Sequence, residues 1–329
     1  MAMHRLATIY GGSGFVGRYV AQRLARAGWR VRVACRRPNE AVFVRMYGSV
    51  GQVEPVFANV RDDATTRAAL MGADAVDNCV GVLAEAGRNL FDAVQAEGAA
   101  RIARLAADEG IARMVQISAI GADADSDSAY SRTKAEGEAA VLRHLPEATI
   151  LRPSIVFGPE DQLFNRFAAM ARRAPVLPVV GPSTRFQPVF VDDVAHAAAL
   201  AVDGRAAPGT YELGGPDVDT FRELMQVMLR TIRRRALILP VPFFAARIMG
   251  ASLDLAQTAT VGLFRNGLLT ADQVRNLARD NVASGAHPGF AELGIEPTAM
   301  EAILPTYLWR FRPSGQYAEI KESARNLRT

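Results

Sequence analysis

A glycine-rich turn near the start of the chain limits the folds that the sequence can adopt. Residues 11–17, Gly-Gly-Ser-Gly-Phe-Val-Gly, follow a short apolar run and precede apolar residues at helical spacing. In a turn from strand to helix, three glycines allow a tight bend, close approach of a phosphate and close packing of the helix on the sheet. Phosphates would lie at the helix N-terminus, where N–H groups favour anions. The turn predicts a dinucleotide site, and the alternative is a merely tight turn.

Short apolar runs alternate with longer stretches rich in Ala, Arg and Leu over the first 155 residues. Each run is continuously apolar, as expected of strands covered on both faces. The alternation is typical of repeated β-α-β units, so we expect an α/β fold with a Rossmann-type, doubly wound parallel sheet. Helices are predicted between the first two strands, ending at Gly28, and over 89–109. The predicted strands lie near 5–10, 30–35, 52–57, 74–80, 112–118 and 148–152.

Proline and glycine become frequent and strands become sparse after residue 155. We therefore predict a dinucleotide-binding domain at 1–155, to which later segments return, a smaller α/β C-terminal region at 156–312 and a polar tail at 313–329. Within the second region, Thr220 and Glu223 have the spacing of a capping box ahead of an apolar helix stripe.

The composition is that of an ordinary globular protein. Of 329 residues, 50% are hydrophobic and 22% charged, and the net charge of +4 does not indicate a nucleic-acid partner. Neither cysteine has a partner at metal-ligand spacing and the four histidines are widely separated, so no metal site is predicted. We expect neither a signal peptide nor a membrane-spanning helix, because the most apolar late stretch, 236–264, is interrupted by prolines and charges.

Two arginines follow the second predicted strand, at the place where an Asp or Glu would hold a ribose 2′-hydroxyl. The guanidinium groups of Arg36 and Arg37 suit a 2′-phosphate instead, which favours NADPH over NADH. The alternative is a solvated basic turn with Glu40 nearby.

The glycine spacing, together with the pair Tyr130 and Lys134, resembles the short-chain dehydrogenase/reductase superfamily in its extended or atypical branch. Residues four apart share a helical face, so Lys134 and a nicotinamide would lower the pKa of the Tyr130 phenol and assist proton exchange with a substrate. Lys134 would also hold the nicotinamide ribose, whether or not anything is reduced. The resemblance implies a serine after the fifth strand that holds the substrate oxygen. Ser118 is the candidate, but the usual run of serines is here Ser-Ala-Ile, and the alternative is a hydroxyl bonded to nearby backbone.

Further segments carry the resemblance, at 151–159, which includes Arg-Pro and Gly-Pro pairs, and at 188–195, where Asp192 suits a helix start. Asn59 and Val60 would lie beside the adenine, with Asn where the family has Asp. The cofactor contacts that the resemblance implies are Gly11, Gly12, Ser13, Gly14, Phe15, Val16, Gly17, Arg36, Arg37, Asn59, Val60, Cys79, Val80, Ser118, Tyr130, Lys134, Pro153 and Ile155.

Segments of the last third, at 239–247, 269–282 and 303–313, taken with 116–123, resemble the nucleotide-binding accessory subunit of respiratory complex I of mitochondria and α-proteobacteria. The resemblance implies a structural NADPH, docking to other complex I subunits near the quinone site, and a peripheral place on the cytoplasmic face of a bacterial inner membrane. The other hypothesis is an NADP(H)-dependent reductase, epimerase or dehydratase that uses Tyr130 and Lys134.

One predicted helix of the second region is unusually apolar. Its apolar side chains follow a run of arginines that ends at Arg235, and this combination suits a membrane surface with anionic lipid or a partner subunit. The alternative is the core of a small domain beside a solvated helix end. The apolar residues are Phe243, Phe244, Ile248, Met249, Leu253 and Leu255, and the arginines are Arg230, Arg233, Arg234 and Arg235.

Overall fold

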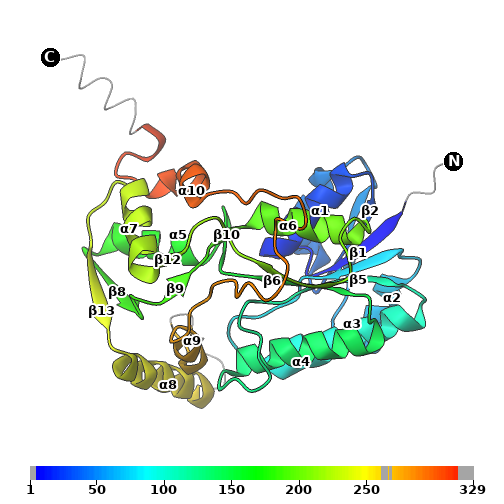
Figure 1. Cartoon of the computed structure of the whole chain (residues 1–329), viewed down its shortest axis with the longest axis horizontal. Coiled ribbons are helices and arrows are strands. Elements are labelled where there is room, and N and C mark those ends of the chain that lie inside the picture. The colour runs from blue at the N-terminus through cyan, green and yellow to red at the C-terminus, as the bar shows by residue number, and fades with distance from the viewer. Residues whose placement is uncertain (1–4, 261–265, 267–268, 318–329) are drawn as a thin grey trace.

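The computed structural model describes residues 5–260, 266 and 269–317, and the centre of this part of the chain is a seven-stranded parallel sheet (Figure 1). The sheet confirms the predicted doubly wound fold, with strand order β11-β6-β5-β4-β1-β2-β3. The order reverses at β1, and a crevice for a ligand is expected at the carboxyl ends of β1 and β4. The strands are β1 (Leu6–Tyr10), β2 (Arg30–Cys35), β3 (Val53–Phe57), β4 (Ala75–Asn78), β5 (Arg113–Ile117), β6 (Thr149–Pro153) and β11 (Gly209–Leu213).

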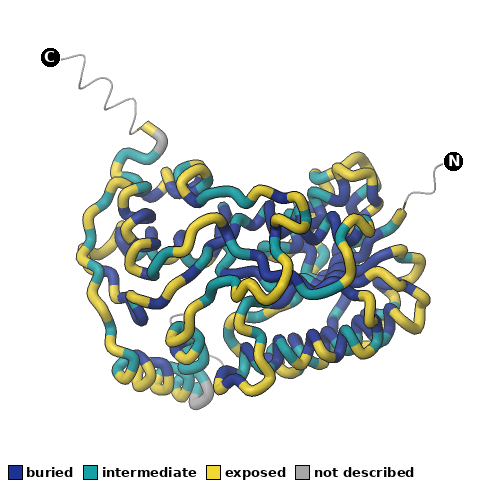
Figure 2. Tube along the Cα trace, viewed as in Figure 1, coloured by how far each residue is buried: buried dark blue, intermediate teal, exposed yellow. Residues whose placement is uncertain are grey.

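Helices cover both faces of the sheet (Figure 1). On one face α1 packs against α6, and on the other α3 lies between α2 and α4. The first layer encloses a core with Leu24, Trp29 and Val194, and the second a core with Tyr10 and Ile102. Figure 2 shows the buried residues gathered in the sheet and on the inner sides of these helices. The helices are α1 (Phe15–Arg26), α2 (Asp63–Leu70), α3 (Glu97–Asp108), α4 (Ala129–His144) and α6 (Val191–Val202).

The predicted strands and the first helix agree with the structure to within about two residues. Gly28 has φ +84°, a left-handed conformation that favours glycine just after a helix. The helix predicted over 89–109 is helical from 91 to 108 in the structure, and its first turn, at 92–96, is a wider π-turn that runs directly into α3. A Cβ at Gly137 of α4 would lie 2.5 Å from the Gln95 carbonyl oxygen in this turn. Glycine at this position therefore allows the backbones of α4 and the π-turn to approach each other closely. Strand β11 was not predicted.

The remaining elements form a second layered unit beside the sheet. Its apolar core includes Phe157, Phe164, Phe221 and Leu304. The predicted capping box is confirmed, since the Thr220 hydroxyl accepts from the Glu223 N–H at 3.3 Å and the Glu223 carboxylate accepts from the Thr220 N–H at 2.8 Å. The elements are β7 (Val156–Phe157), α5 (Leu163–Arg173), β8 (Val176–Val180), β9 (Arg185–Phe186), β10 (Val189–Phe190), β12 (Asp219–Thr220), α7 (Phe221–Thr231), β13 (Leu237–Val241), α8 (Phe243–Ala259), α9 (Ala271–Asn276) and α10 (Met300–Leu308).

Helices α8 and α9 pack on each other at one end of this second unit, next to the start of α4 (Figure 1). None of the described helices combines the length and apolarity needed to cross a membrane. Short 3₁₀ segments lie at Pro38–Tyr47, Trp309–Phe311 and Gly315–Tyr317. From residue 318 onward, the polar tail predicted at 313–329 lies outside the described residues.

Candidate nucleotide-binding site

The turn between β1 and α1 requires glycine at three positions for three geometric reasons. Gly11 has φ +72°, and a Cβ there would lie 3.1 Å from the Cys79 carbonyl and 3.2 Å from the Val80 nitrogen. Gly14 occupies the N-cap of α1, and a Cβ there would lie 3.0 Å from the Gly11 carbonyl oxygen. A Cβ at Gly17 would lie 2.5 Å from the Gly11 carbonyl oxygen. The turn is thus compact, with backbone N–H groups at a helix N-terminus that suit a pyrophosphate.

A cavity of about 780 Å³ opens beside this turn, next to the end of β2. Arg36 donates a hydrogen bond to the neutral side chain of Asn89 at 2.7 Å, whereas Arg37 pairs with the Glu40 carboxylate at 3.2 Å. Because only Arg37 has an acidic partner among these contacts, Arg36 is the better candidate to meet an anionic ligand. The cavity is lined by Ser13, Cys35, Arg36, Arg37, Glu40, Ala41, Phe43, Ala86, Gly87, Asn89 and Gln257.

Asn59 and Val60 lie after β3 but do not line this cavity. The Asn59 side-chain oxygen accepts from the Arg61 backbone N–H at 3.2 Å, and Val60 is buried against Gly98 of α3. In the described structure, Asn59 therefore shapes the loop after β3. Its predicted contact with adenine remains a prediction.

Tyr130 and Lys134 lie in the first two turns of α4, as the spacing predicts. The Lys134 ammonium donates to the Ile117 carbonyl at 3.1 Å and lies 6.0 Å from the centre of the Tyr130 ring. Burial lowers the pKa of Lys134 to about 8 and raises the pKa of Tyr130 to about 12. In the chain by itself, burial therefore outweighs the expected lowering of the phenol pKa. The positive charge of an oxidised nicotinamide bound beside the phenol would act in the opposite direction and lower its pKa, whereas a reduced nicotinamide carries no such charge.

Ser118 follows β5 directly, and its hydroxyl is buried without a hydrogen-bond partner among the described residues. Its backbone N–H donates to the Leu151 carbonyl at 2.7 Å, so the main chain is anchored to β6. Buried hydroxyl groups are nearly always bonded. The unbonded oxygen is therefore a group that a bound ligand can satisfy, which argues against the alternative of a hydroxyl bonded to nearby backbone.

Asp77 is a buried carboxylate that the sequence analysis did not single out. It lies in β4, between β1 and β5, and accepts a hydrogen bond from the Cys79 thiol at 3.2 Å, while its other oxygen has no partner in the described structure. Burial raises the pKa of Asp77 to about 7, and it also raises the pKa of Cys79. The only signal of this residue in the sequence was an Asp inside an apolar strand, and the pattern of a strand does not reveal which of its faces is shielded from water.

Pro153 and Ile155 lie where the sheet meets the second unit. Pro153 ends β6 and accepts from the Ile120 N–H at 2.9 Å, whereas the Ile155 carbonyl accepts from the Val189 N–H at 3.0 Å. Asp192 lies in the first turn of α6 as predicted, and Arg23 binds its carboxylate at 2.7 Å. No cluster of three or more His, Cys, Asp or Glu side chains within the described ranges is arranged to hold a metal.

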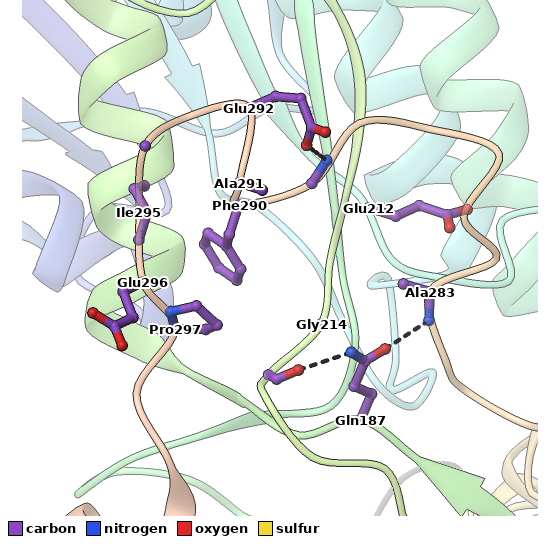
Figure 3. Close-up of a pocket in the computed structure, with 13 residues that line it drawn as sticks. Gln187, Glu212, Gly214, Ala283, Phe290, Ala291, Glu292, Ile295, Glu296 and Pro297 are labelled. Atoms are coloured by element: carbon purple, nitrogen blue, oxygen red, sulfur yellow. Dashed lines mark hydrogen bonds between the residues drawn. The ribbon is translucent and has the colours of Figure 1, made fainter.

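A second pocket, of about 620 Å³, lies between β11 and the segment around Phe290 (Figure 3). Two of its polar side chains are bonded to the surrounding main chain: Gln187 bridges the Gly215 carbonyl and the Ala283 N–H, and Glu292 accepts from the Gly289 N–H at 2.7 Å. These bonds shape the pocket wall and leave the glycine turn as the stronger candidate for a ligand site.

The site near β1 fits a nicotinamide dinucleotide. Its glycine turn offers backbone N–H groups to a pyrophosphate, Arg36 offers a cation at the cavity, and Lys134 and Ser118 offer polar groups at the end of β5. Bound there, such a group supplies hydride chemistry. The chain supplies binding and orientation.

Comparisons with known proteins agree with this geometry. The model of the NAD dependent epimerase/dehydratase family matches residues 7–214. The NADH dehydrogenase [ubiquinone] 1 alpha subcomplex subunit 9 of Arabidopsis thaliana is 35% identical over 94% of this chain and 79% of its own length. The NADH-ubiquinone oxidoreductase 40 kDa subunit of Neurospora crassa is 30% identical over 94% of this chain and 80% of its own length.

Among solved structures, the UDP-glucose 4-epimerase of Thermus thermophilus superposes with a TM-score of 0.68 at 18% identity, covering 94% of this chain and 99% of the epimerase. At this identity the likeness concerns the fold alone. The family match, by contrast, extends over most of the sheet and includes the glycine turn, Tyr130 and Lys134. The chain therefore belongs to the NAD dependent epimerase/dehydratase family, in the group that includes these mitochondrial NADH dehydrogenase subunits.

Proposed function

We propose that this chain is an accessory subunit of a proton-pumping NADH:quinone oxidoreductase, complex I. In this role it holds NADPH as a structural group and stabilises the junction of the peripheral arm with the membrane, near the quinone site. The extent of similarity carries the proposal. The family model ends at residue 214, but relatives named as subunits of this oxidoreductase align with 94% of the chain. They therefore share its second unit as well as its nucleotide-binding sheet.

NADPH, rather than NADH, is proposed from the charge beside the cavity. A 2′-phosphate would bring negative charge next to Arg36, whose bond to Asn89 leaves the guanidinium charge uncompensated by that partner. Charge-assisted hydrogen bonds between Arg and phosphate are strong, and their geometry is specific. A ribose 2′-hydroxyl would instead require an acceptor, and the chain has Arg at both positions after β2.

A stripe of exposed apolar side chains on α8 is proposed as the docking face. Phe244, Ile248 and Leu255 are 69%, 68% and 70% exposed. Their spacing of four and seven residues places them on one side of the helix. We call these three residues the α8 stripe. We propose that other complex I subunits bind to it at the cytoplasmic face of a bacterial inner membrane. Anionic lipid would lie near the arginines at 230–235, which β13 separates from α8.

The alternative is an NADP(H)-dependent reductase, epimerase or dehydratase, and the placement of Tyr130 and Lys134 on one face of α4 favours it. The two functions differ in what must accompany the chain. An accessory subunit acts only inside its complex, whereas an enzyme of this class turns over as an isolated protein. The unbonded hydroxyl of Ser118 is compatible with either function.

Purification of the tagged native chain from host membranes, solubilised in mild detergent, tests the proposal by mass spectrometry. We expect quinone reductase subunits in fixed stoichiometry. A chain variant with Phe244→Ser and Ile248→Ser should lose them. Val42→Ser with Met46→Ser is the matched control, because these side chains are also exposed and four apart but lie elsewhere. Recovery of the chain alone from the soluble fraction would reject the accessory role and direct attention to substrates.

A further inference from the structure

Asp272 of helix α9 caps the N-terminus of α4, although the bonded residues lie more than 140 positions apart along the chain. The Asp272 carboxylate accepts from the N–H groups of Ala129 and Tyr130, at 2.8 and 3.2 Å, and from the Ser128 hydroxyl at 2.8 Å. The first N–H groups of a helix have no partner within the helix, so a carboxylate placed there both bonds them and offsets the helix dipole. Asp272 of α9 therefore helps to position the first turn of the helix that carries Tyr130 and Lys134.

Helix α9, together with its neighbour α8, also bonds to the segment after β4, which lies on the other side of the nucleotide site from α4. The side-chain amide of Gln273, in α9, donates to the Leu83 carbonyl at 3.1 Å, and that of Gln257, in α8, donates to the Glu85 carbonyl at 3.0 Å. Gln257 also lines the cavity that contains Arg36. Helices α8 and α9 thus contact both α4 and the segment after β4, between which a dinucleotide would lie.

Helices α8 and α9 are joined closely to each other but have little apolar core of their own. The Asp254 carboxylate of α8 accepts from the Ala271 N–H at 2.9 Å, and a Cβ at Gly250 would lie 2.8 Å from the same nitrogen. The fully buried apolar cluster at this junction consists of Val180, Ala246 and Val274, with partly buried neighbours around it. A region with few buried apolar contacts opens at low free-energy cost, so its order depends on its polar attachments.

We propose that α8 and α9 form a nucleotide-responsive element that couples occupancy of the dinucleotide site to order in the α8 stripe. A dinucleotide that fixes α4 and the segment after β4 stabilises both surfaces on which the two helices rest. The inference rests on the proposed function, since it requires the nucleotide site and the docking face. Coupling is reciprocal, so a partner bound to the α8 stripe tightens nucleotide binding by the same factor by which the nucleotide tightens docking.

Hydrogen exchange of the full-length chain, with and without saturating NADPH, tests the coupling without any variant. We expect exchange in the peptides covering α8 and α9 to slow by at least about fivefold, the lower end of usual coupling between sites. Helix α10 is the internal reference, because it packs mainly on α5, α7 and β10 rather than on α4 or the segment after β4. Slowing in α8 and α9 no greater than in α10 would overturn the proposal.

The variant Asp272→Ala tests the route of the coupling. At NADPH concentrations that saturate the variant, the slowing of exchange that NADPH causes in α8 and α9 should be no greater than in α10. The Kd for NADPH should rise at least about fivefold. Asp217→Ala, at an exposed aspartate, is the matched control and should behave as the wild-type chain. If Asp272→Ala does not fold, Gln273→Ala removes the bond to the Leu83 carbonyl together with the bond to the Thr270 N–H that caps α9, and it should weaken the protection in part. Unchanged protection in a folded variant would refute the route.

A titration of nicotinamide fluorescence separates failure of this inference from failure of the proposed function. If the chain binds NADPH but α8 and α9 do not respond, the coupling is refuted and the structural cofactor stands. If the chain binds no NADPH at all, the proposed cofactor fails, and the coupling fails with it.

Discussion

Arg36 donates a hydrogen bond to Asn89 at 2.7 Å, and this contact joins the end of β2 to the segment that follows β4 at the mouth of the cavity. The two residues are 53 positions apart, and the bond holds the guanidinium at the cavity without supplying an opposite charge. Arg37, its neighbour, is held instead by the Glu40 carboxylate. The two arginines, equivalent by sequence, are therefore unequal in the structure.

This inequality predicts different effects of the two alanine variants on nucleotide affinity. Arg36→Ala should raise the Kd for NADPH by about 10- to 100-fold, the loss of a charge-assisted bond, and leave the Kd for NADH nearly unchanged. Arg37→Ala should have a much smaller effect. Fluorescence titration with both nucleotides measures this, and equal loss of NADPH and NADH binding in the first variant would contradict the 2′-phosphate assignment.

Tyr130→Phe distinguishes the accessory role from the enzyme. Burial already raises the pKa of the Tyr130 phenol to about 12 in the chain alone, so the group is protonated at neutral pH. We expect the variant to retain NADPH and to support unchanged quinone reductase activity of the assembled complex. A turnover of the isolated wild-type chain that disappears in Tyr130→Phe would support the enzyme instead.

Gly17→Ala should destabilise the glycine turn, because the new Cβ would lie 2.5 Å from the Gly11 carbonyl oxygen and 2.7 Å from the Gly12 Cα. Both are backbone atoms that cannot rotate away. The free energy of unfolding should fall by about 1–3 kcal/mol, the usual cost of overpacking, and NADPH binding should weaken. Gly98→Ala is the milder control, because its Cβ would meet the Val60 side chain at 3.2 Å rather than backbone atoms at 2.5 and 2.7 Å. A Gly17→Ala chain as stable as Gly98→Ala would refute the close-packing argument.

Asp77→Asn should stabilise the chain more at pH 8 than at pH 5. Burial raises the pKa of Asp77 from 3.8 to about 7, so between these values the folded chain binds more protons than the unfolded chain. Stability contributed by this group therefore falls as pH rises through that window. The asparagine removes the buried charge, and its gain in unfolding free energy should be larger at pH 8 by about 2–3 kcal/mol. Denaturant unfolding at both pH values measures it, with the exposed Asp217→Asn as control; equal gains at both values would show that Asp77 does not bury a charge.

Much of the fold could be predicted because its determinants are local in the sequence. Continuous apolar runs marked the central strands, the glycine turn marked the start of α1, and the spacing of Thr220 and Glu223 marked the start of α7. Each depends on residues within a few positions of one another, whose backbone conformations and caps are set by neighbouring groups. The pair Tyr130 and Lys134 was found through the family resemblance, and this motif is also local, since residues four apart meet on one face of a helix.

The sequence by itself determined the layered architecture, the glycine turn after β1 and the capping box of α7, through periodicity, glycine geometry and capping. Only the tertiary structure decided that Arg36 bonds to a neutral side chain while Arg37 has an acidic partner, that Asp77 is buried, and that Asp272 caps the start of α4. The Arg36 bond joins residues 53 positions apart, the Asp272 bonds join residues 142 to 144 positions apart, and Asp77 is buried by neighbouring elements. No local pattern encodes a hydrogen bond that exists only when distant elements pack together.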